Sequence, residues 1–346
     1  MKSSQENPQT DILTASRKVA SLFSGCGGMD LGFEGGFNVL RKSIIDRKDI
    51  VKTKRSLMIA LPRTAFRTIF ACDVAKSTKV AWENYFVERR DSNSEAFHLE
   101  SIVDVVKNLR ENKRDYGLKN SKREYRVDVV TGGFPCNDFS VAGKRLGFES
   151  NKSHRGNKAI LDTEIDDPTA ENRGMLYYWM KEFISEVRPK VFYAENVKGL
   201  VSLGDAKRVI EHDFSSIGDS SYFVLPVKVL KAMEFGVPQT RERVIFIGVD
   251  KTHLLPEVRK FLDQNGNLPP ELDLYPIESH GSERLPLVTA GEALNDLGEP
   301  ESSLDHSHQC YSRAKYMGKM QGQSEVREDK PGPTIRAEHH GNIEFR

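Results

Sequence analysis

Short apolar runs alternate with amphipathic stretches along the first 250 residues of the chain. Six of these runs have the length and composition of buried strands, at residues 18–23, 68–72, 127–131, 191–194, 222–230 and 244–249. The clearest helical pattern runs from Leu176 to Val187, with apolar side chains at i, i+3, i+4, i+7, i+8 and i+11, and Pro189 ends it. Further helices are expected after Asp73 and over 205–217. The alternation predicts an α/β fold, a mostly parallel sheet with helices on both faces.

This regular pattern ends near residue 251. Residues 264–346 are rich in Pro, Gly, Ser, His and acidic side chains, and few apolar positions there are periodic. We therefore predict three parts: a loose N-terminal tail over 1–16, one α/β domain over 17–252, and an irregular region over 253–346.

Composition places the chain among globular proteins, with 38% hydrophobic and 29% charged residues. No apolar run approaches the roughly 20 residues that span a bilayer, and the polar N-terminus lacks the apolar core of a secretory signal. The four cysteines form no C-x-x-C pair and no metal-ligand spacing. These features predict a reduced, cytoplasmic setting with no membrane partner and no metal.

The net charge of +1 does not indicate a nucleic-acid partner, but the basic side chains are clustered. Residues 41–67 hold nine Lys and Arg against two acids, and residues 107–126 hold eight against three. Solvated loops explain these two stretches as well as phosphate contacts do. Residues 144–158 hold five against one and follow Cys136 closely, which favours a contact to phosphate there.

A glycine-rich turn, Ser24-Gly25-Cys26-Gly27-Gly28, follows the first predicted strand and opens a helix. Small residues let a backbone approach a ligand, and a helix N-terminus favours negative groups, so the turn is a candidate cofactor cradle. Glycines also serve tight turns. The third glycine position of a dinucleotide fingerprint holds Asp30, which excludes that motif. Asp73 ends the second strand, where an acid can bind ribose hydroxyls or cap the next helix.

The segment Gly133-Phe134-Pro135-Cys136-Asn137 places a cysteine where the third strand ends. The basic stretch after Cys136 favours its thiolate, although an inert buried thiol is the common fate of a lone cysteine. Glu195 ends the next strand and could act as an acid or form a structural salt bridge. Arg241 and Arg243 alternate along the start of a strand, so both could hold Glu195 or a base oxygen.

Together these segments resemble the DNA cytosine-5 methyltransferase family of bacterial restriction–modification systems. The resemblance covers residues 18–250 and rests on five blocks in the family's order: Phe23-Ser24-Gly25-Cys26-Gly27-Gly28, Gly133-Phe134-Pro135-Cys136, Glu195-Asn196-Val197, Gly236-Val237-Pro238-Gln239 and Gln239-Thr240-Arg241-Glu242-Arg243. It implies the Rossmann-like fold of S-adenosylmethionine-dependent methyltransferases, followed by the start of an irregular target-recognition region.

The resemblance also implies a set of cofactor-binding residues. S-Adenosyl-L-methionine would be bound by Phe23, Ser24, Gly25, Gly27, Gly28, Asp73, Val74, Pro135 and Leu176. The glycine turn would hold the methionine end, Asp73 the ribose and Val74 the adenine.

The substrate would be a cytosine in double-stranded DNA. Cys136 would be the nucleophile, Glu195 would bond the N3 edge of the base, and Arg243 would contact its carbonyl. Attack of the thiolate on carbon 6 makes carbon 5 nucleophilic enough to take the methyl group. The base must first be flipped out of the duplex, at a cost of a few kcal/mol.

Four further residues would support this substrate site. Gln239 and Arg241 would stabilise it, and Lys144 and Arg145 resemble part of the loop that closes over the flipped base.

The chain also departs from the family pattern. It has Glu100-Ser101-Ile102 where the family has an acidic residue before an isoleucine, so we predict no adenine contact there. The basic insertion at about 40–67 has no assigned role. Family members continue into a helical return with a Gly-Asn-containing segment, so we expect a complementing C-terminal polypeptide to supply it, or else a truncated product.

These departures leave two alternatives to a complete DNA methyltransferase: a catalytically incomplete subunit or remnant that is inactive alone, and an RNA cytosine methyltransferase of the same architecture. A cognate restriction endonuclease is expected in the same system. The sequence does not predict which DNA site is recognised.

Overall fold

A computed structural model describes residues 16–45, 57–86, 96–135, 175–203, 205–295 and 326–335, together with Ser302 and His306. The chain forms two compact units. Unit 1 comprises Met1–Gly36, Pro62–Val229 and Val244–Leu274, and unit 2 comprises Phe37–Leu61, Leu230–Arg243 and Tyr275–Arg346. The chain therefore passes between the units five times, whereas the sequence predicts one boundary near residue 252.

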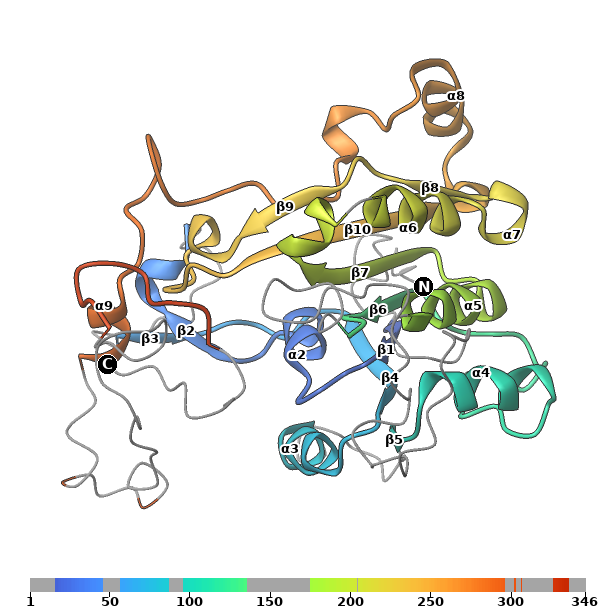
Figure 1. Cartoon of the computed structure of the whole chain (residues 1–346), viewed down its shortest axis with the longest axis horizontal. Coiled ribbons are helices and arrows are strands. Elements are labelled where there is room, and N and C mark those ends of the chain that lie inside the picture. The colour runs from blue at the N-terminus through green and yellow to red at the C-terminus, as the bar shows by residue number, and fades with distance from the viewer. Residues whose placement is uncertain are drawn as a thin grey trace, which may run out of the picture. The chain divides into compact units, whose positions relative to one another are not determined.

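Unit 1 is organised around an eight-stranded sheet in the order β5-β4-β1-β6-β7-β10-β8, with β9 paired to β10 (Figure 1). The strands are β1 (Arg17–Leu22), β4 (Phe66–Asp73), β5 (Phe97–Leu99), β6 (Val129–Gly132), β7 (Val191–Val197), β8 (Tyr222–Val224), β9 (Lys228–Lys231) and β10 (Glu242–Asp250). β1 runs parallel to both β4 and β6, β4 to β5, and β6 to β7, while β10 is antiparallel to β8. The predicted mostly parallel sheet is confirmed.

Helices cover both faces of this sheet, as predicted. The α-helices of unit 1 are α2 (Gly28–Glu34), α3 (Lys76–Phe86), α4 (Ile102–Arg110), α5 (Leu176–Val187), α6 (Ala206–Ser215), α7 (Ile217–Ser220) and α8 (Pro256–Asn265). Alternate residues of β4 show the two layers. Phe70 and Cys72 pack in a core with α4, α5 and α6, whereas Ala71 packs with Trp82 and Phe86 of α3.

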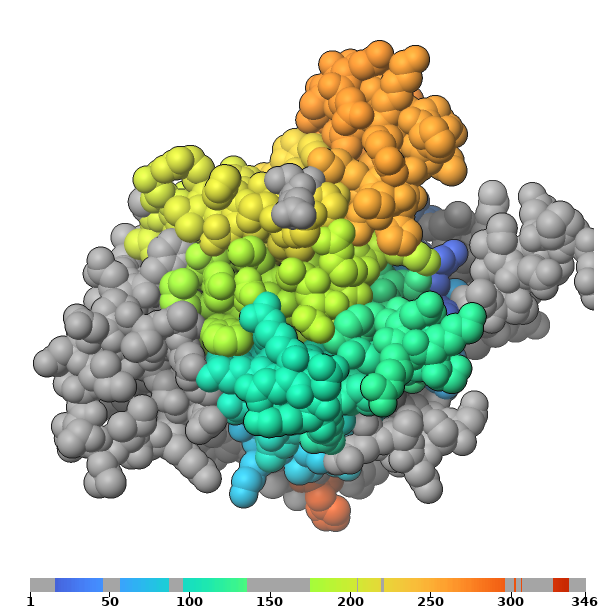
Figure 2. Space-filling model, turned by 90° about the vertical axis from the view of Figure 1, so that its right-hand side faces the viewer, coloured from blue at the N-terminus to red at the C-terminus, as the bar shows by residue number. Residues whose placement is uncertain are grey.

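Three predicted elements differ from the structure. The strand predicted over 222–230 is two strands, β8 and β9, because Pro226 between them has no backbone N–H to donate. The helix predicted over 205–217 ends at Ser215, and α7 follows. The region after residue 251 was expected to be irregular, but it contains α8, which stands out from unit 1 in both views (Figures 1 and 2).

Helix α4 is absent from the elements predicted above, although the sequence carries a signal for it. Ile102, Val105, Val106 and Leu109 are spaced on one helical face and are buried. The Ser101 side chain accepts a hydrogen bond from the Val103 N–H at 3.3 Å and caps the helix.

The basic stretch over 107–126 lies at the end of the sheet where β6 begins, away from the strand ends that carry the candidate site. Figure 2 shows this segment and α4 beside α5. Arg110 pairs with Glu182, and the cations of Arg114 and Lys119 each lie 4.6 Å from the ring of Tyr116 and Tyr125 respectively. These contacts within the chain favour a solvated surface over a phosphate-binding one.

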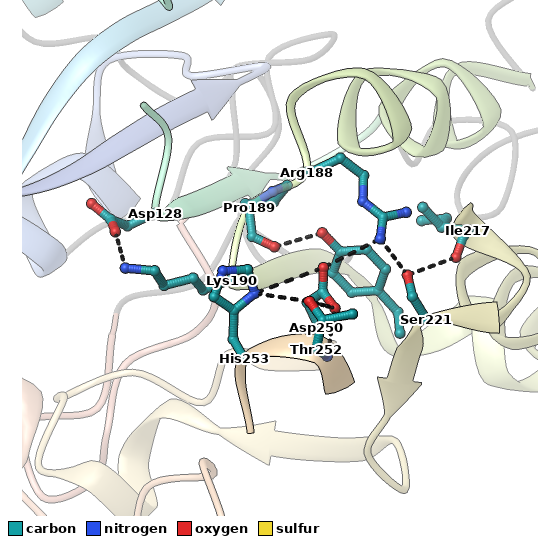
Figure 3. Close-up of polar contacts among 10 residues, drawn as sticks. Asp128, Arg188, Pro189, Lys190, Ile217, Ser221, Asp250, Thr252 and His253 are labelled. Carbon is teal, nitrogen blue, oxygen red and sulfur yellow. Dashed lines mark hydrogen bonds and ion pairs between the residues drawn. The ribbon is translucent and has the colours of Figure 1, made fainter. Parts of the chain in front are cut away.

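Polar contacts around the buried Asp250 connect the strands at this end of the sheet (Figure 3). The Asp250 carboxylate accepts hydrogen bonds from Thr252 N and Oγ1 and lies 3.3 Å from Arg188 Nη2. Lys190 Nζ contacts Asp128 at 2.8 Å. These contacts hold the starts of β6 and β7 to the end of β10, which leaves the opposite ends of the strands for chemistry.

Unit 2 is assembled from segments that are far apart in sequence. Its elements are the antiparallel pair β2 (Asn38–Leu40) and β3 (Met58–Ala60), the 3-10 helices η1 (Arg41–Ser43) and η5 (Ala232–Phe235), and helix α9 (Ala290–Leu294). The remaining 3-10 helices, in unit 1, are η4 (Lys198–Ser202), η6 (Lys251–His253) and η7 (Pro270–Leu272). Within the described part of the chain, every helix is too short or too polar to cross a membrane.

Candidate active site

The carboxyl ends of the parallel strands in unit 1 bring the predicted segments to one edge of the sheet. From β1 the chain proceeds to β4 and β5 on one side, and β6 and β7 lie on the other. The order of successive strands therefore changes direction between β1 and β6. At such a point the loops that follow the two strands turn to opposite faces of the sheet and leave a crevice between them. The glycine turn leaves β1 and the Gly133 loop leaves β6, so the structure places these two segments next to each other.

The glycine turn is fixed by contacts from both sides. Ser24 N donates to Cys72 O at 3.0 Å, and Ser24 Oγ donates to Ser21 O at 2.9 Å. Gly27 has φ +90°, and a Cβ there would lie 2.8 Å from Trp82 Cδ1 and closer still to the ring of Phe86. Only glycine can adopt this conformation in this space.

Asp73 links the turn to the next helix. Its Oδ2 accepts a hydrogen bond from Gly25 N at 3.0 Å, and its Oδ1 accepts one from Ala75 N at 2.9 Å. Ala75 precedes the first residue of α3, Lys76, so this bond orders the chain that enters the helix. Each carboxylate oxygen retains a further lone pair, so the predicted contact to ribose stays open.

The turn offers room for the predicted cofactor. An added Cβ at Gly25 or Gly28 would meet no described atom within 4 Å. Val74 follows Asp73 and is 38% exposed, which is unusual for a valine beside a strand end. Open space over two glycines next to an acid and an exposed apolar side chain suits a ligand with a polar end and an aromatic end. These residues therefore fit S-adenosylmethionine.

The loop after β6 lies against Glu195 of β7. A Cβ on Gly133 would be only 3.2 Å from Glu195 Oε2, so the absence of a side chain lets the carboxylate approach the backbone. Asn196 is 1% exposed, and its Nδ2 donates to Phe134 O at 3.1 Å. Asn196 thereby fixes the backbone just before Pro135, the last described residue of this loop. Cys136, Lys144 and Arg145 lie outside the described residues.

Leu176 is the first residue of α5 and is buried in the core cluster that also contains Leu22 and Phe134. This position gives it a packing role beneath the two loops. Its predicted contact with the cofactor stays a prediction.

Gln239, Arg241 and Arg243 belong to unit 2. Gln239 N donates to Val237 O at 2.7 Å within a turn, and Gln239 pairs with Gly332 in a parallel bridge. Arg243 Nη1 donates to Glu242 O at 2.7 Å. All three side chains are partly buried.

Two buried polar residues that hold this edge in place are not among the residues predicted from the sequence to carry the chemistry. Asp30 is fully buried, and its Oδ2 accepts a hydrogen bond from Trp82 Nε1 at 2.9 Å, which holds α3 against α2, the helix that follows the glycine turn. Asn196 enters the sequence prediction only as part of a matched block. A polar residue inside an otherwise apolar strand or helix was the available signal in both cases.

The other chemistry at this edge is limited. Burial raises the pKa of the Cys72 thiol far above its ordinary value, so this cysteine is a structural residue. In the described part of the chain, no group of three or more His, Cys, Asp or Glu side chains could hold a metal ion.

Known proteins match this chain over most of its length. A profile of the C-5 cytosine-specific DNA methylase family matches residues 59–158 and 166–338. The Type II methyltransferase M.BspRI of Lysinibacillus sphaericus is 32% identical over 81% of this chain and 52% of its own length. M.BsuRI of Bacillus subtilis is 31% identical over 84% of this chain and 53% of its own length. The Type II methyltransferase M.AquIA of Picosynechococcus sp. is 28% identical over 81% of this chain and 89% of its own length. The chain thus spans about half the length of the first two relatives and most of the third.

Proposed function

Because the chain belongs to the C-5 cytosine-specific DNA methylase family, we propose that it methylates carbon 5 of cytosine in a specific sequence of double-stranded DNA. Members of this family use S-adenosyl-L-methionine, which supplies an electrophilic methyl group. One observation of the structure carries the proposal: the glycine turn after β1 and the loop that leads to Cys136 leave adjacent strands, and Glu195 lies against that loop.

The residues of this site divide the chemistry between them. The Cys136 thiolate forms a bond to carbon 6 of the flipped cytosine, while Glu195 supplies a proton at N3. The electron pair displaced onto carbon 5 would take the methyl group, whose bond to the sulfonium sulfur would break and leave a neutral thioether. A base then removes the proton from carbon 5, the bond between sulfur and carbon 6 breaks, and the thiolate is released while N3 returns its proton to Glu195. Arg243 contacts the base carbonyl, with Gln239 and Arg241 in support.

Lys144 and Arg145 would contact DNA phosphates near the flipped base. A cognate restriction endonuclease would share the recognition sequence of the enzyme. The reaction would take place in the cytoplasm.

Replacement of Cys136 by serine tests the mechanism. Cys136→Ser should reduce methyl transfer at least about a thousandfold, because a serine hydroxyl is a much weaker nucleophile than a cysteine thiolate. Cofactor affinity should change little. DNA with 5-fluorocytosine at the target should trap an adduct at Cys136, since fluorine cannot leave as a proton does. Transfer of tritiated methyl groups and mass spectrometry of the adduct are the measurements.

The control is Cys310→Ser, which removes a different thiol and should transfer at the wild-type rate. Full activity of Cys136→Ser, or turnover of fluorinated DNA without an adduct, would contradict the covalent route. A matched RNA substrate completes the experiment, because transfer only to RNA would contradict DNA as substrate.

A further inference from the structure

The β2–β3 hairpin is joined, within unit 2, to the turn that carries Gln239. Ser43 closes η1 just after β2, and its Oγ donates to Gly236 O at 2.6 Å. Gly236 has φ +77°, and a Cβ there would lie 2.6 Å from Ser43 O and 2.7 Å from His280 Cε1. The two backbones are so close that only glycine fits between them.

His280 completes this contact from a third segment. It is 1% exposed, with Nε2 2.9 Å from Lys42 O and Nδ1 2.7 Å from Ser279 Oγ. A carbonyl oxygen only accepts, so Nε2 carries the proton and Nδ1 accepts from the Ser279 hydroxyl. The N–H groups of Ser279 and His280 both donate to Glu234 O, at 2.8 and 3.0 Å. A buried imidazole thus ties the inserted hairpin to η5, immediately before Gly236.

The other end of the same turn is also held. Gly332 N donates to Pro238 O at 3.0 Å, and Thr240 N donates to Gly332 O at 2.8 Å. The segment around Gly332 is in turn bound to α9, because Ala290 N donates to Lys330 O at 2.8 Å. Glu292 of α9 forms an ion pair with Lys42, which lies in η1 beside Ser43. The turn over 236–240 is therefore held on one side by η1 and on the other by the Gly332 segment, and α9 contacts both. We call this set of contacts the ring.

From this ring we infer that Ser43 and His280 are positioning residues for the cytosine site. They fix the main chain over 236–240, and with it the direction in which Gln239, Arg241 and Arg243 are presented. This inference rests on the proposed function for what those three side chains contact. It gives the inserted hairpin a role in substrate recognition that its basic composition alone did not indicate.

Hydrogen exchange tests the positioning without any activity assay. Ser43→Ala removes one hydrogen bond to Gly236, so the amides of Gln239 and Thr240 should exchange about three- to tenfold faster. Ser43→Thr keeps the hydroxyl and should restore protection. The Leu31 amide, bonded to Gly27 O in the cofactor turn, should not change in either variant. Ser215→Ala is the matched control, because its hydroxyl also donates to a backbone carbonyl, at 2.8 Å, but in unit 1.

Steady-state kinetics then distinguish a positioning role from a general contribution to the stability of the protein. Ser43→Ala should raise KM for DNA about three- to tenfold and leave kcat and cofactor affinity within about twofold. In a Gln239→Ala background the same substitution should have a smaller effect than in the wild type, because the part that passes through Gln239 is already lost. Fully additive effects, or an unchanged KM in an active enzyme, would overturn the positioning role. Unchanged exchange over 236–240 would overturn the contact itself. If the wild-type chain transfers no methyl group, the proposed function fails while exchange still decides the inference.

Discussion

Gly27 combines two constraints on a single residue, the backbone conformation and the space that surrounds it. Its φ of +90° is rarely adopted by residues with a side chain, and its Cα faces the stacked rings of Trp82 and Phe86. These rings belong to α3, which packs against the glycine turn. The turn is therefore shaped by packing behind it as much as by any ligand in front of it.

Gly27→Ala should consequently destabilise unit 1 and weaken cofactor binding together. Backbone strain of about 1 kcal/mol and overpacking of about 1–3 kcal/mol predict a total loss of about 2–4 kcal/mol. Denaturant unfolding and calorimetric titration with S-adenosylmethionine would measure the two effects.

Gly32→Ala is the matched control for this prediction. Gly32 lies inside α2, where an added Cβ meets no described atom within 4 Å, so alanine should stabilise the helix by about 0.5–1 kcal/mol. Equal stability of the Gly27 and Gly32 variants would contradict the packing argument.

At the scale of the element, α9 shows how a short helix can be held by its first turn. Thr289 and Glu292 form a capping box, with Glu292 N donating to Thr289 Oγ1 at 3.2 Å and Thr289 N donating to Glu292 Oε2 at 3.0 Å. The other oxygen of Glu292 pairs with Lys42 of the inserted hairpin. The hydrogen bond from Lys42 lowers the pKa of the Glu292 carboxyl, with a further contribution from Thr289.

This shift predicts how the contact depends on pH. A carboxyl with a lowered pKa stabilises the folded state fully above its ordinary pKa of 4.5 and loses that contribution as the pH falls through the lower folded value. Glu292→Gln keeps the capping geometry but not the charge. Because the side chains of Lys42 and Glu292 are 64% and 32% exposed, the variant should lose less than about 1 kcal/mol at pH 7.

At pH 3 the wild-type Glu292 carboxyl is more fully protonated than at pH 7 and resembles glutamine. The difference in free energy of unfolding between wild type and Glu292→Gln should therefore shrink toward zero. Thermal unfolding at pH 7, 5 and 3 would measure this trend. A difference that persists undiminished at the lowest pH would show that the ion pair does not cause it.

Elements were predictable where they bury a periodic face, and much less so where backbone contacts build them. The apolar runs of β1, β6 and β7 predict that the glycine turn, the Gly133 loop and Glu195 lie on one edge of the sheet, and the strand order agrees. The contacts of unit 2 are of another kind. Bonds such as Ser43 Oγ to Gly236 O and Thr240 N to Gly332 O join segments up to 193 residues apart and require no apolar pattern. Nothing in local composition could therefore connect the basic insertion with Gln239.

At the scale of the whole molecule, the inserted hairpin leaves unit 1 and returns to it at adjacent points. Gly36 N donates to Pro62 O at 2.9 Å, and Gly35 forms an antiparallel bridge with Arg63. The ends of Phe37–Leu61 thus meet as the two strands of a hairpin do. A short flexible linker such as Gly-Ser-Gly-Ser could join Gly36 to Pro62, because these two residues already lie within hydrogen-bonding distance of each other.

Replacement of Phe37–Leu61 by Gly-Ser-Gly-Ser should therefore affect cofactor binding and DNA binding differently. Cofactor affinity should stay within about twofold of wild type, because the glycine turn, Asp73 and Val74 keep all their described contacts in unit 1. Specific DNA binding should fall at least about tenfold, because Gly236 loses Ser43 and His280 loses Lys42 O, which leaves a buried donor unpaired. Calorimetry with the cofactor and gel-shift titration with target DNA give the two affinities. Parallel loss of both affinities would mean that the hairpin supports the fold of unit 1, and unchanged DNA binding would mean that it has no part in recognition.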